Sequence, residues 1–532
     1  MTQSSDTATV DLFIIGGGIN GCGIARDAAG RGLSVVLAER NDLASATSSA
    51  STKLFHGGLR YLEYFEFRLV REALIEREVL LRAMPHISWP MRFVLPYHED
   101  MRFDTETPTS KLLSMFVPWM RGRRPAWLIR LGLFLYDHLG GREVLPGTAT
   151  LSLAGTPEGR PLNPRFRKAY EYSDCWVNDS RLVVLNARDA EARGARIRTR
   201  TEVISATRAE KLWRVETRDT ATGETSVTLA RMLVNAGGPW VGEIIRSRVH
   251  VASRDGIRLV RGSHIVTRRL YDHDKCYFFQ GSDGRIIFAI PYETDFTLIG
   301  TTDAEHEDPF TKPVCTPEER RYLIDFANRY FAKAIGDEDI VWSYSGVRPL
   351  HDDGASSATA ATRDYTLKVD AGGGAPILSV FGGKITTYRR LAEGALERIG
   401  VHLEVPGGPW TAGAPLPGGD FAVDGFEALV ADLGARFGFL DPFTTRRLAR
   451  SYGTEAAQVL GGAGTAGDLG RDFGAGLTET EVAWLMDKEF ARTAEDVLWR
   501  RSKLGLRLDA AQAEDLGKWM AARTLSATAT AE

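Results

Sequence analysis

The chain has 532 residues, of which 43% are hydrophobic and 25% charged, enough for about two to four domains with sizeable cores. The formal net charge of −3 gives no general attraction to nucleic acid, so no nucleic-acid partner is expected. The four cysteines are far apart and form no C-x-x-C pair, which predicts neither a metal site nor a disulfide framework, and no apolar run is long enough to predict a membrane-spanning helix.

Residues 11–39 carry the pattern of a dinucleotide-binding unit. The apolar run Leu12–Ile15 predicts a buried strand, and a G-x-G-x-x-G motif formed by Gly16, Gly18 and Gly21 follows it. The first glycine permits a tight turn, the second lets a pyrophosphate approach the backbone, and the third lets helix and strand pack closely. The helix that follows offers free N–H groups and a partial positive charge to the phosphates.

The unit closes with a second predicted buried strand, Leu33–Ala38, which ends at Glu39. The Glu39 carboxylate is placed to accept hydrogen bonds from a ribose 2′-hydroxyl. An acidic residue at this point argues against a 2′-phosphate, so FAD or NAD is favoured over NADP.

The rest of the chain alternates between helical and strand patterns. Residues 66–84 predict a helix with one apolar face that ends before Pro85. From about Met91 to Leu350 the pattern is mixed, and Arg285–Ile290 and Phe296–Ile299 predict strands of an antiparallel sheet.

Two later segments, Met232–Trp240 and Ile377–Tyr388, each predict a strand meeting a glycine turn, and they are interpreted as returns to the nucleotide-binding domain. A glycine turn at Gly382 and Gly383, so far from the first, favours a flavoprotein over a simple NAD enzyme. The N-terminus of the helix after that turn would stabilise negative charge on a reduced flavin.

Residues 107–136 contain no acidic side chain, whereas basic and aromatic side chains alternate along them. This composition is typical of helices that lie in the lipid headgroup layer, and a buried helical pair with a basic loop is the alternative.

Several strings occur in one order and together resemble the FAD-dependent, quinone-linked glycerol-3-phosphate dehydrogenases. They are TSSASTKLFHGGLRYLE (47–63), YSDCWVND (172–179), RGSHIV (261–266), IGTTD (299–303), YSGVRPL (344–350), TRDYTL (362–367) and FGGKITTYR (381–389). The resemblance implies oxidation of sn-glycerol 3-phosphate to dihydroxyacetone phosphate by hydride transfer from C2 to FAD N5, with electrons passed to a membrane quinone. It also implies a cytoplasmic protein attached peripherally to the inner face of the plasma membrane, and it leaves a homodimer open.

The implied fold class is α/β (α+β), with a Rossmann-like FAD-binding domain, an inserted mixed or antiparallel-sheet substrate domain of the D-amino-acid-oxidase type, and a helical C-terminal cap. The domain boundaries expected from this fold are 1–90, with returns near 172–245 and 340–400, for the FAD-binding domain; 91–171 and 246–339 for the substrate domain, with a membrane-contact segment at 107–140; 401–523 for the cap; and 524–532 for a disordered tail.

A phosphate-bearing substrate needs two or more Arg or Lys side chains, because their donors match phosphate oxygens. By the resemblance, Arg60, Lys384 and Thr387 hold the substrate beside the flavin, with a further hydroxyl from Tyr61. Arg348 orients the substrate hydroxyls, and Arg363 helps to neutralise the phosphate. The cofactor-binding set expected around the flavin is Gly16, Gly18, Gly21, Glu39, Ser48, Ser49, His56, Gly237, Gly382 and Gly383.

The C2 hydroxyl also needs a proton acceptor. His264 is the preferred base, since imidazole titrates near neutral pH, and Arg348 and Lys384 complete the expected catalytic group. Arg348 or a water molecule are the alternatives for the base. No metal is expected.

Four other functions stay open at this point. They are an oxidase that passes electrons from the same substrate to dioxygen, an FAD amino-acid oxidase, an NAD enzyme, and a nucleotide-binding regulator without turnover. Four candidate cations argue against an amino-acid substrate, because a single carboxylate needs only one forked partner.

Overall fold

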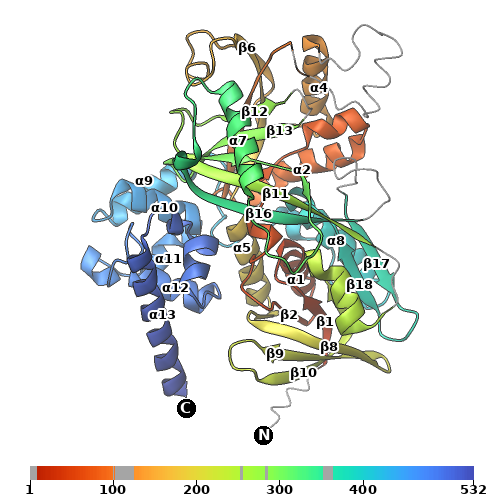
Figure 1. Ribbon diagram of the computed structural model, residues 1–532. Coiled ribbons are helices and arrows are strands. Elements are labelled where there is room, and N and C mark those ends of the chain that lie inside the picture. Colours follow the sequence, from red (N-terminus) through yellow and green to blue (C-terminus); the bar gives the residue numbers. More distant parts are fainter. Residues whose placement is uncertain are drawn as a thin grey trace.

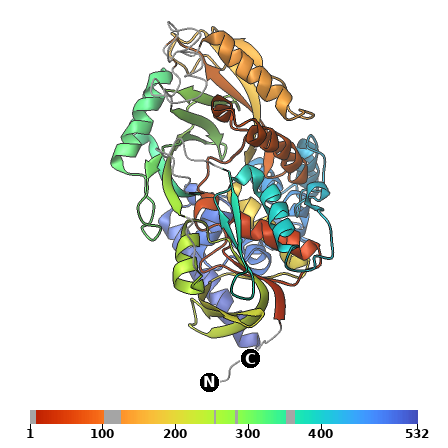
Figure 2. The same ribbon diagram turned by 90° about the vertical axis from the view of Figure 1, so that its right-hand side faces the viewer.

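The computed structural model describes residues 9–99, 101, 125–251, 256–281, 285–351 and 364–531. Within these residues the chain forms two β-sheets with helices packed on them, and a separate group of helices follows from about residue 420. Figure 1 shows the smaller sheet in the lower part of the molecule, the larger sheet above it, and the C-terminal helices in blue at the left. The turned view in Figure 2 shows the same order of the two sheets along the long axis.

The smaller sheet is parallel at its centre, in the order β17-β18-β10-β1-β2-β7, with β9 antiparallel to β10 and β8 antiparallel to β9. Its strands are β1 (Thr9–Ile15), β2 (Val35–Ala38), β7 (Arg196–Arg198), β8 (Thr201–Ala209), β9 (Leu212–Asp219), β10 (Thr225–Asn235), β17 (Thr366–Asp370) and β18 (Ile377–Phe381). The two predicted returns, at 232–240 and 377–388, therefore lie in this sheet, as β10 and β18.

Strand β1 is apolar on both sides because both faces of the sheet are covered. Leu12 and Ile14 join the core formed with helices α1 (Ile19–Gly30), α5 (Asp179–Ala192) and α8 (Tyr388–Ile399). Phe13 and Ile15 join the opposite core, which includes Trp213 of β9. A parallel strand that is buried on both faces has a continuous run of apolar residues, and Leu12–Ile15 is such a run in the sequence.

The larger sheet is mostly antiparallel, with one parallel pair between β4 and β12. Its strands are β3 (Leu54–Phe55), β4 (Ser88–Pro96), β5 (Ala149–Ser152), β6 (Lys168–Val177), β11 (Ile257–Arg268), β12 (Cys276–Gln280), β13 (Ile286–Tyr292), β14 (Phe296–Gly300), β15 (Ala304–Glu305) and β16 (Ile340–His351). The expected strands at 285–290 and 296–299 are β13 and β14.

Hydrogen bonding differs from the expected domain boundaries in three places. Strands β3, β6 and β16 belong to the larger sheet, although the sequence analysis places 54–55, 172–177 and 340–351 in the FAD-binding domain. Their pairing is set by partners far away in the sequence, such as Phe55 with Cys175 and Val260 with Arg348.

Helices α2 (Phe67–Ala83) and α4 (Ala126–Leu139) contribute to a core on one face of the larger sheet, and α7 (Pro317–Tyr330) to a core on the other. A short helix, α6 (Val241–Ile244), follows β10. The helix predicted over 66–84 is α2, and its cap residue Met84 directly precedes Pro85.

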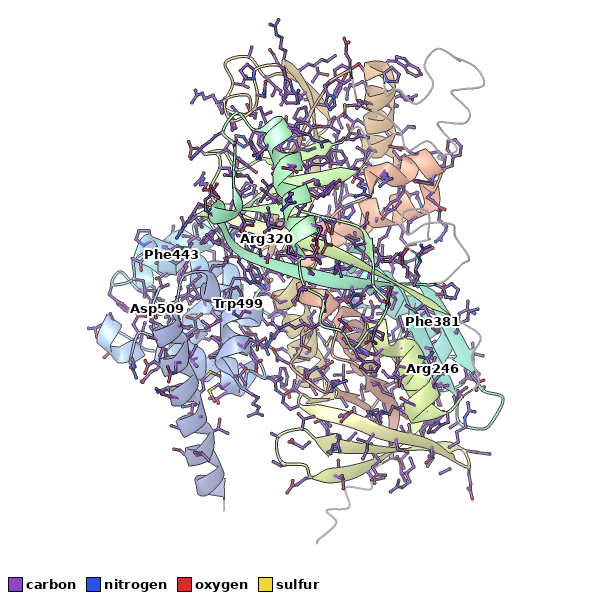
Figure 3. All side chains as sticks on the ribbon, viewed as in Figure 1. Arg246, Arg320, Phe381, Phe443, Trp499 and Asp509 are labelled. Atoms are coloured by element: carbon purple, nitrogen blue, oxygen red, sulfur yellow. The ribbon has the colours of Figure 1, made fainter. Side chains whose placement is uncertain are left out.

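The C-terminal helices surround their own core. They are α9 (Phe426–Arg436), α10 (Pro442–Tyr452), α11 (Ala456–Leu460), α12 (Glu479–Lys488) and α13 (Ala510–Ala531). Trp499, labelled in Figure 3, stacks on Trp342 of β16 with ring centroids 4.5 Å apart and so joins this domain to the larger sheet.

The predicted disordered tail at 524–532 is corrected by α13, which continues as a helix through Ala531. The tail sequence contains neither proline nor glycine, the two residues that most oppose a helix, so nothing in it ends the helix abruptly.

No helix among the described residues is long and apolar enough to cross a membrane.

Candidate functional site

The first glycine turn joins β1 to α1 and is packed so tightly that side chains are excluded. Gly16 has a φ of +111°, and a Cβ on it would lie 2.6 Å from the carbonyl oxygen of Ala236. A Cβ on Gly21 would lie 2.0 Å from the carbonyl oxygen of Gly16. These contacts match the roles expected of the first and third glycines, a tight turn and close helix–strand packing.

The acidic residue after β2 faces this turn. Glu39 is partly buried, and its carboxylate accepts the backbone N–H of Gly17 at 2.7 Å and that of Asn41 at 2.8 Å. Burial raises the pKa of Glu39, although the two N–H donors oppose that shift. Ser48 lies beside the turn, where its Oγ accepts the backbone N–H of Ile19, the first residue of α1, at 3.0 Å.

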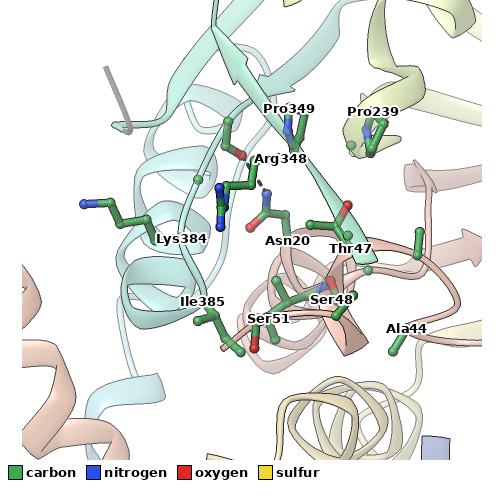
Figure 4. Close-up of a pocket in the computed structure, with 18 of the residues that line it drawn as sticks. Asn20, Ala44, Thr47, Ser48, Ser51, Pro239, Arg348, Pro349, Lys384 and Ile385 are labelled. Atoms are coloured by element: carbon green, nitrogen blue, oxygen red, sulfur yellow. Dashed lines mark hydrogen bonds between the residues drawn. The ribbon is translucent and has the colours of Figure 1, made fainter. Parts of the chain in front are cut away.

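The second glycine turn, after β18, lies against the start of α1. Gly382 and Gly383 have φ values of +74° and +102°, which favour glycine. Asn20 of α1 donates from Nδ2 to the carbonyl oxygen of Gly382 at 3.2 Å. Two turns more than 350 residues apart in the chain therefore form one surface, and Figure 4 shows Asn20, Ser48 and Lys384 around the same pocket.

A cavity of about 490 Å³ connects these turns with the larger sheet. It is lined by most of the site residues expected from the sequence: Gly16, Gly18, Glu39, Ser48, His56, Arg60, Tyr61, Gly237, His264, Arg348, Gly382, Gly383 and Lys384. Gly21 is absent from the lining because it faces Gly16, and Ser49 because it bonds back to Ala46.

Thr387, a further expected substrate residue, is absent from the described cavity lining. Thr387 is buried and its N–H donates to the carbonyl oxygen of Lys384, whereas the neighbouring Thr386 lines the cavity. The short 3-10 turn Ile385–Thr387 turns the first of the two threonines toward the cavity. Arg363 lies outside the described residues.

Basic side chains from distant segments meet beside the second glycine turn. The Lys384 ammonium lies 3.8 Å from the centroid of the Tyr61 ring, although 323 positions separate the two residues. Arg60, next to Tyr61, lines the same cavity. Arg348 is held by an ion pair with Asp303 and by a 3.1 Å hydrogen bond to Thr301 Oγ1.

His264 is completely buried on β11, where it pairs with Gly300 on one side and Tyr344 on the other. Its ring stacks on Tyr344 with centroids 4.7 Å apart, and Nε2 lies 3.0 Å from Thr52 Oγ1. Nδ1 has no hydrogen-bond partner among the described residues. Burial lowers the pKa of His264 well below its usual value, and the charges of Arg348 and Lys53 lower it further, so the ring is neutral at pH 7.

The cavity also has lining residues that the sequence analysis assigned no role. Two of them, Asp303 and Asp174, belong to the strings IGTTD and YSDCWVND, on which the family resemblance depends. Membership in these strings could have identified both as candidate site residues. Asn20 lies inside the G-x-G-x-x-G motif, which was its signal, whereas Arg285 had none, because only the folded chain brings it to the cavity.

The lining fits a flavin dinucleotide. Gly16 and Gly18 line the cavity, where the backbone of the first turn could receive a pyrophosphate, and Glu39 offers acceptors at one end. Three buried polar atoms in the lining residues, Asn20 Oδ1, Trp240 Nε1 and His264 Nδ1, lack hydrogen-bond partners within the described parts of the chain. Buried polar atoms are normally paired, so such atoms indicate a bound polar molecule.

Comparisons with known proteins agree with this geometry. Residues 11–389 match the family model "FAD dependent oxidoreductase", and residues 410–523 match the model "C-terminal domain of alpha-glycerophosphate oxidase". The D-erythritol 1-phosphate dehydrogenase of Brucella abortus is 50% identical over 97% of this chain and 98% of its own length.

The aerobic glycerol-3-phosphate dehydrogenase of Escherichia coli is 48% identical over 96% of this chain and 97% of its own length. Among solved structures, the glycerol-3-phosphate dehydrogenase of Bacillus halodurans complexed with FAD superimposes with a TM-score of 0.73 at 27% identity. That match covers 97% of this chain and 90% of the other.

Proposed function

Since the chain belongs to the family of FAD dependent oxidoreductases, we propose that it is an FAD enzyme that oxidises sn-glycerol 3-phosphate to dihydroxyacetone phosphate and passes the electrons to a membrane quinone. The observation that carries the substrate assignment is the meeting of Lys384 with Tyr61 and Arg60 beside the second glycine turn. FAD, when bound, supplies the hydride acceptor for the C2 carbinol.

The two ends of the substrate meet different electrostatic surroundings. Arg60 and Lys384 offer forked and single-point donors to the phosphate oxygens. The Asp303 carboxylate offsets the charge of Arg348, so this pair can orient hydroxyl groups by donating and accepting hydrogen bonds. This division favours a polyol phosphate over an amino acid, whose carboxylate needs only one forked partner.

His264 is suited to take the proton of the C2 hydroxyl. A ring that donates from Nε2 to Thr52 has a free lone pair on Nδ1, and the ring is neutral at pH 7. Its low pKa makes it a weak base, so a bound substrate must hold the hydroxyl close to it while Arg348 stabilises the developing negative charge on oxygen.

Helix α4 supports contact with a membrane surface. Trp127, Leu131 and Phe134 follow one another at positions i, i+4 and i+7 and are each about half exposed, whereas Leu133 and Tyr136 on the opposite side are buried. Phe65 and Phe67, before and at the start of α2, are also exposed. An exposed apolar stripe of this kind fits the acyl boundary of a lipid layer. The basic part of the predicted membrane segment, at 107–124, lies outside the described residues.

D-erythritol 1-phosphate is the second candidate substrate, because the relative named for it is 50% identical over nearly the whole chain. Both candidates are linear polyols with one phosphate, so the same cations serve either of them. They differ in the number of hydroxylated carbons that the Arg348–Asp303 pair must accommodate.

The test is an anaerobic titration of the purified yellow protein with each polyol phosphate, followed by a quinone analogue. We expect glycerol 3-phosphate to bleach the flavin absorbance and the quinone analogue to restore it. Arg60→Ala and Lys384→Ala should each raise the concentration needed for bleaching by about 10- to 100-fold while the yellow colour stays, since a hydrogen bond to a charged group contributes about 1.5–3 kcal/mol.

Arg523→Ala is the matched control, because that arginine pairs with Asp487 on the surface of the C-terminal domain. Bleaching by D-erythritol 1-phosphate at far lower concentrations would transfer the assignment to that substrate. Bleaching of the wild-type protein by neither compound would refute a polyol phosphate dehydrogenase, and loss of colour in both site variants would show that Arg60 and Lys384 hold the cofactor.

A further inference from the structure

The segment His56–Tyr61, here called the substrate arm, connects strand β3 to the short helix that carries Arg60 and Tyr61. Its course depends on two glycines. Gly58 has a φ of +76°, and a Cβ on Gly57 would lie 2.4 Å from the Leu74 side chain and 2.8 Å from the hydroxyl of Tyr136. The arm therefore presents bare backbone to its neighbours.

A buried hydrogen-bond chain holds that backbone from one side. The Gly57 N–H donates to the Tyr136 hydroxyl at 2.7 Å, and that hydroxyl donates to the Asp174 carboxylate, with 2.8 Å to Oδ1. Arg77 Nη1 donates to the same Oδ1 at 2.6 Å. Tyr136, Asp174 and Arg77 are 1%, 2% and 3% exposed, so water does not replace these bonds.

The other side of the arm is tied to the second glycine turn. The His56 N–H donates to Thr386 Oγ1 at 3.3 Å, and Thr386 lies two residues after Lys384. The arm is thus held between the turn that carries one substrate cation and the helix that carries Tyr136, and its own cation, Arg60, follows three residues after Gly57.

Among the described residues, Asp174 is the one other acceptor within reach of the Gly57 N–H. Without the Tyr136 hydroxyl, the Gly57 N–H retains only a 3.4 Å contact to Asp174 Oδ1, at the weak end of hydrogen-bond geometry. Burial and the Asp174 charge raise the pKa of Tyr136 well above its usual value, so the hydroxyl keeps the proton that it donates.

We propose that Tyr136 is a positioning residue for the substrate: through Gly57 it sets the substrate arm so that Arg60 and Tyr61 meet the phosphate together with Lys384. This inference rests on the proposed polyol phosphate substrate. It means that the geometry of the phosphate site is set by α4, the helix whose opposite side is exposed, as well as by the residues that touch the ligand.

The experiment compares Tyr136→Phe with Tyr170→Phe in the FAD-loaded enzyme. Tyr170 is a buried tyrosine of β6 whose hydroxyl donates to the carbonyl oxygen of Ala126, in α4, at 3.2 Å and not to the substrate arm. With a soluble dye as electron acceptor, Tyr136→Phe should raise KM for glycerol 3-phosphate about tenfold with kcat within about twofold of wild type, as expected for one hydrogen bond to a buried group. Hydrogen exchange over residues 55–64 should become faster in this variant alone.

Equal KM values in Tyr136→Phe and wild type, or equal changes in both variants, would overturn the proposal. Loss of FAD from Tyr136→Phe but not from Tyr170→Phe would also overturn it, because the hydroxyl would then act on cofactor retention. If wild-type enzyme is not reduced by glycerol 3-phosphate, the proposed function fails, and hydrogen exchange over 55–64 still decides whether Tyr136 holds the arm.

Discussion

At the scale of single residues, the site is built by groups whose neighbours leave them little freedom. Glu39 shows this clearly, because both carboxylate oxygens already accept backbone N–H groups before a ribose arrives. The carboxylate is thereby oriented in advance, and pre-orientation reduces the entropy lost on binding. Arg348 is oriented in the same way by Asp303 and Thr301.

A residue-scale prediction concerns His86, which is buried with neither ring nitrogen bonded to any described residue. Burial lowers its pKa well below the usual value, and Arg181 and Arg450 add to the shift. The folded protein therefore keeps His86 neutral, whereas the unfolded chain takes up a proton below about pH 6.5. Stability should fall as pH decreases below that point, by about 1.4 kcal/mol per pH unit from this residue.

Urea unfolding of the wild type, His86→Gln and His402→Gln between pH 7.5 and 5.5 checks this prediction. His86→Gln should lose less stability on acidification than the other two, because His402 is exposed. Identical pH slopes in all three proteins would mean that His86 accepts a proton in the folded state.

At the scale of elements, α4 has two sides with different partners. On one side, the Tyr136 hydroxyl accepts a hydrogen bond from the substrate arm. On the other side, Trp127, Leu131 and Phe134 are exposed. Helical periodicity makes this possible, since residues three and four positions apart share a face.

The exposed side leads to a prediction about membrane binding. The double change Trp127→Ala and Leu131→Ala should weaken binding to anionic phospholipid vesicles by about 10- to 100-fold, because the two side chains together bury apolar surface worth about 1.5–3 kcal/mol in the acyl boundary. Cosedimentation with vesicles measures the effect.

A control removes apolar surface elsewhere. Val401 and Leu525 are more exposed than the α4 residues, at 76% and 72%, but belong to other segments. The double change Val401→Ala and Leu525→Ala should leave vesicle binding intact. An equal loss of vesicle binding in both double variants would show that binding depends on exposed apolar surface in general and not on α4.

At the scale of the whole molecule, buried ion pairs join the C-terminal domain to the loop that follows Glu39. Asp42, three residues after Glu39, accepts from Arg501 with two 2.8 Å bonds and from Arg500 at 2.6 Å. The loop that carries Asp42 also packs on the first glycine turn, where the Ala44 N–H donates to the Gly17 carbonyl oxygen at 3.1 Å. Docking of the C-terminal domain and shape of the dinucleotide site are therefore connected.

Replacing Asp42 by Asn should lower the free energy of unfolding by about 3–5 kcal/mol, because Arg501 would be left buried without a carboxylate, whereas Arg500 would keep its pairs with Asp496 and Glu495. FAD should then be released at lower urea concentration, as followed by flavin fluorescence. Asp487→Asn is the control: it removes an exposed partner of Arg523 and should cost at most about 1 kcal/mol. Similar stability and similar flavin release in both variants would mean that docking of the C-terminal domain does not affect cofactor binding.

Much of the dinucleotide unit could be predicted from the sequence because its signals are local. The strand before Gly16, the acid at Glu39 and the helix now seen as α2 depend on neighbours within a few turns of the chain. The second glycine turn was equally visible, because β18 is apolar and the two glycines need positive φ values. Family resemblance supplied the basic residues, and Arg60, Arg348 and Lys384 line one cavity in the folded chain.

Sequence alone therefore determined the type of cofactor site, since backbone preference belongs to short segments, and the family resemblance added the candidate cations. The tertiary structure alone decided that β3, β6 and β16 join the larger sheet, that Thr386 lines the cavity instead of Thr387, and that Tyr136 reaches Gly57. These features depend on strand pairing and side-chain direction between residues tens to hundreds of positions apart. Such contacts form only when the two sheets and their helices are packed together.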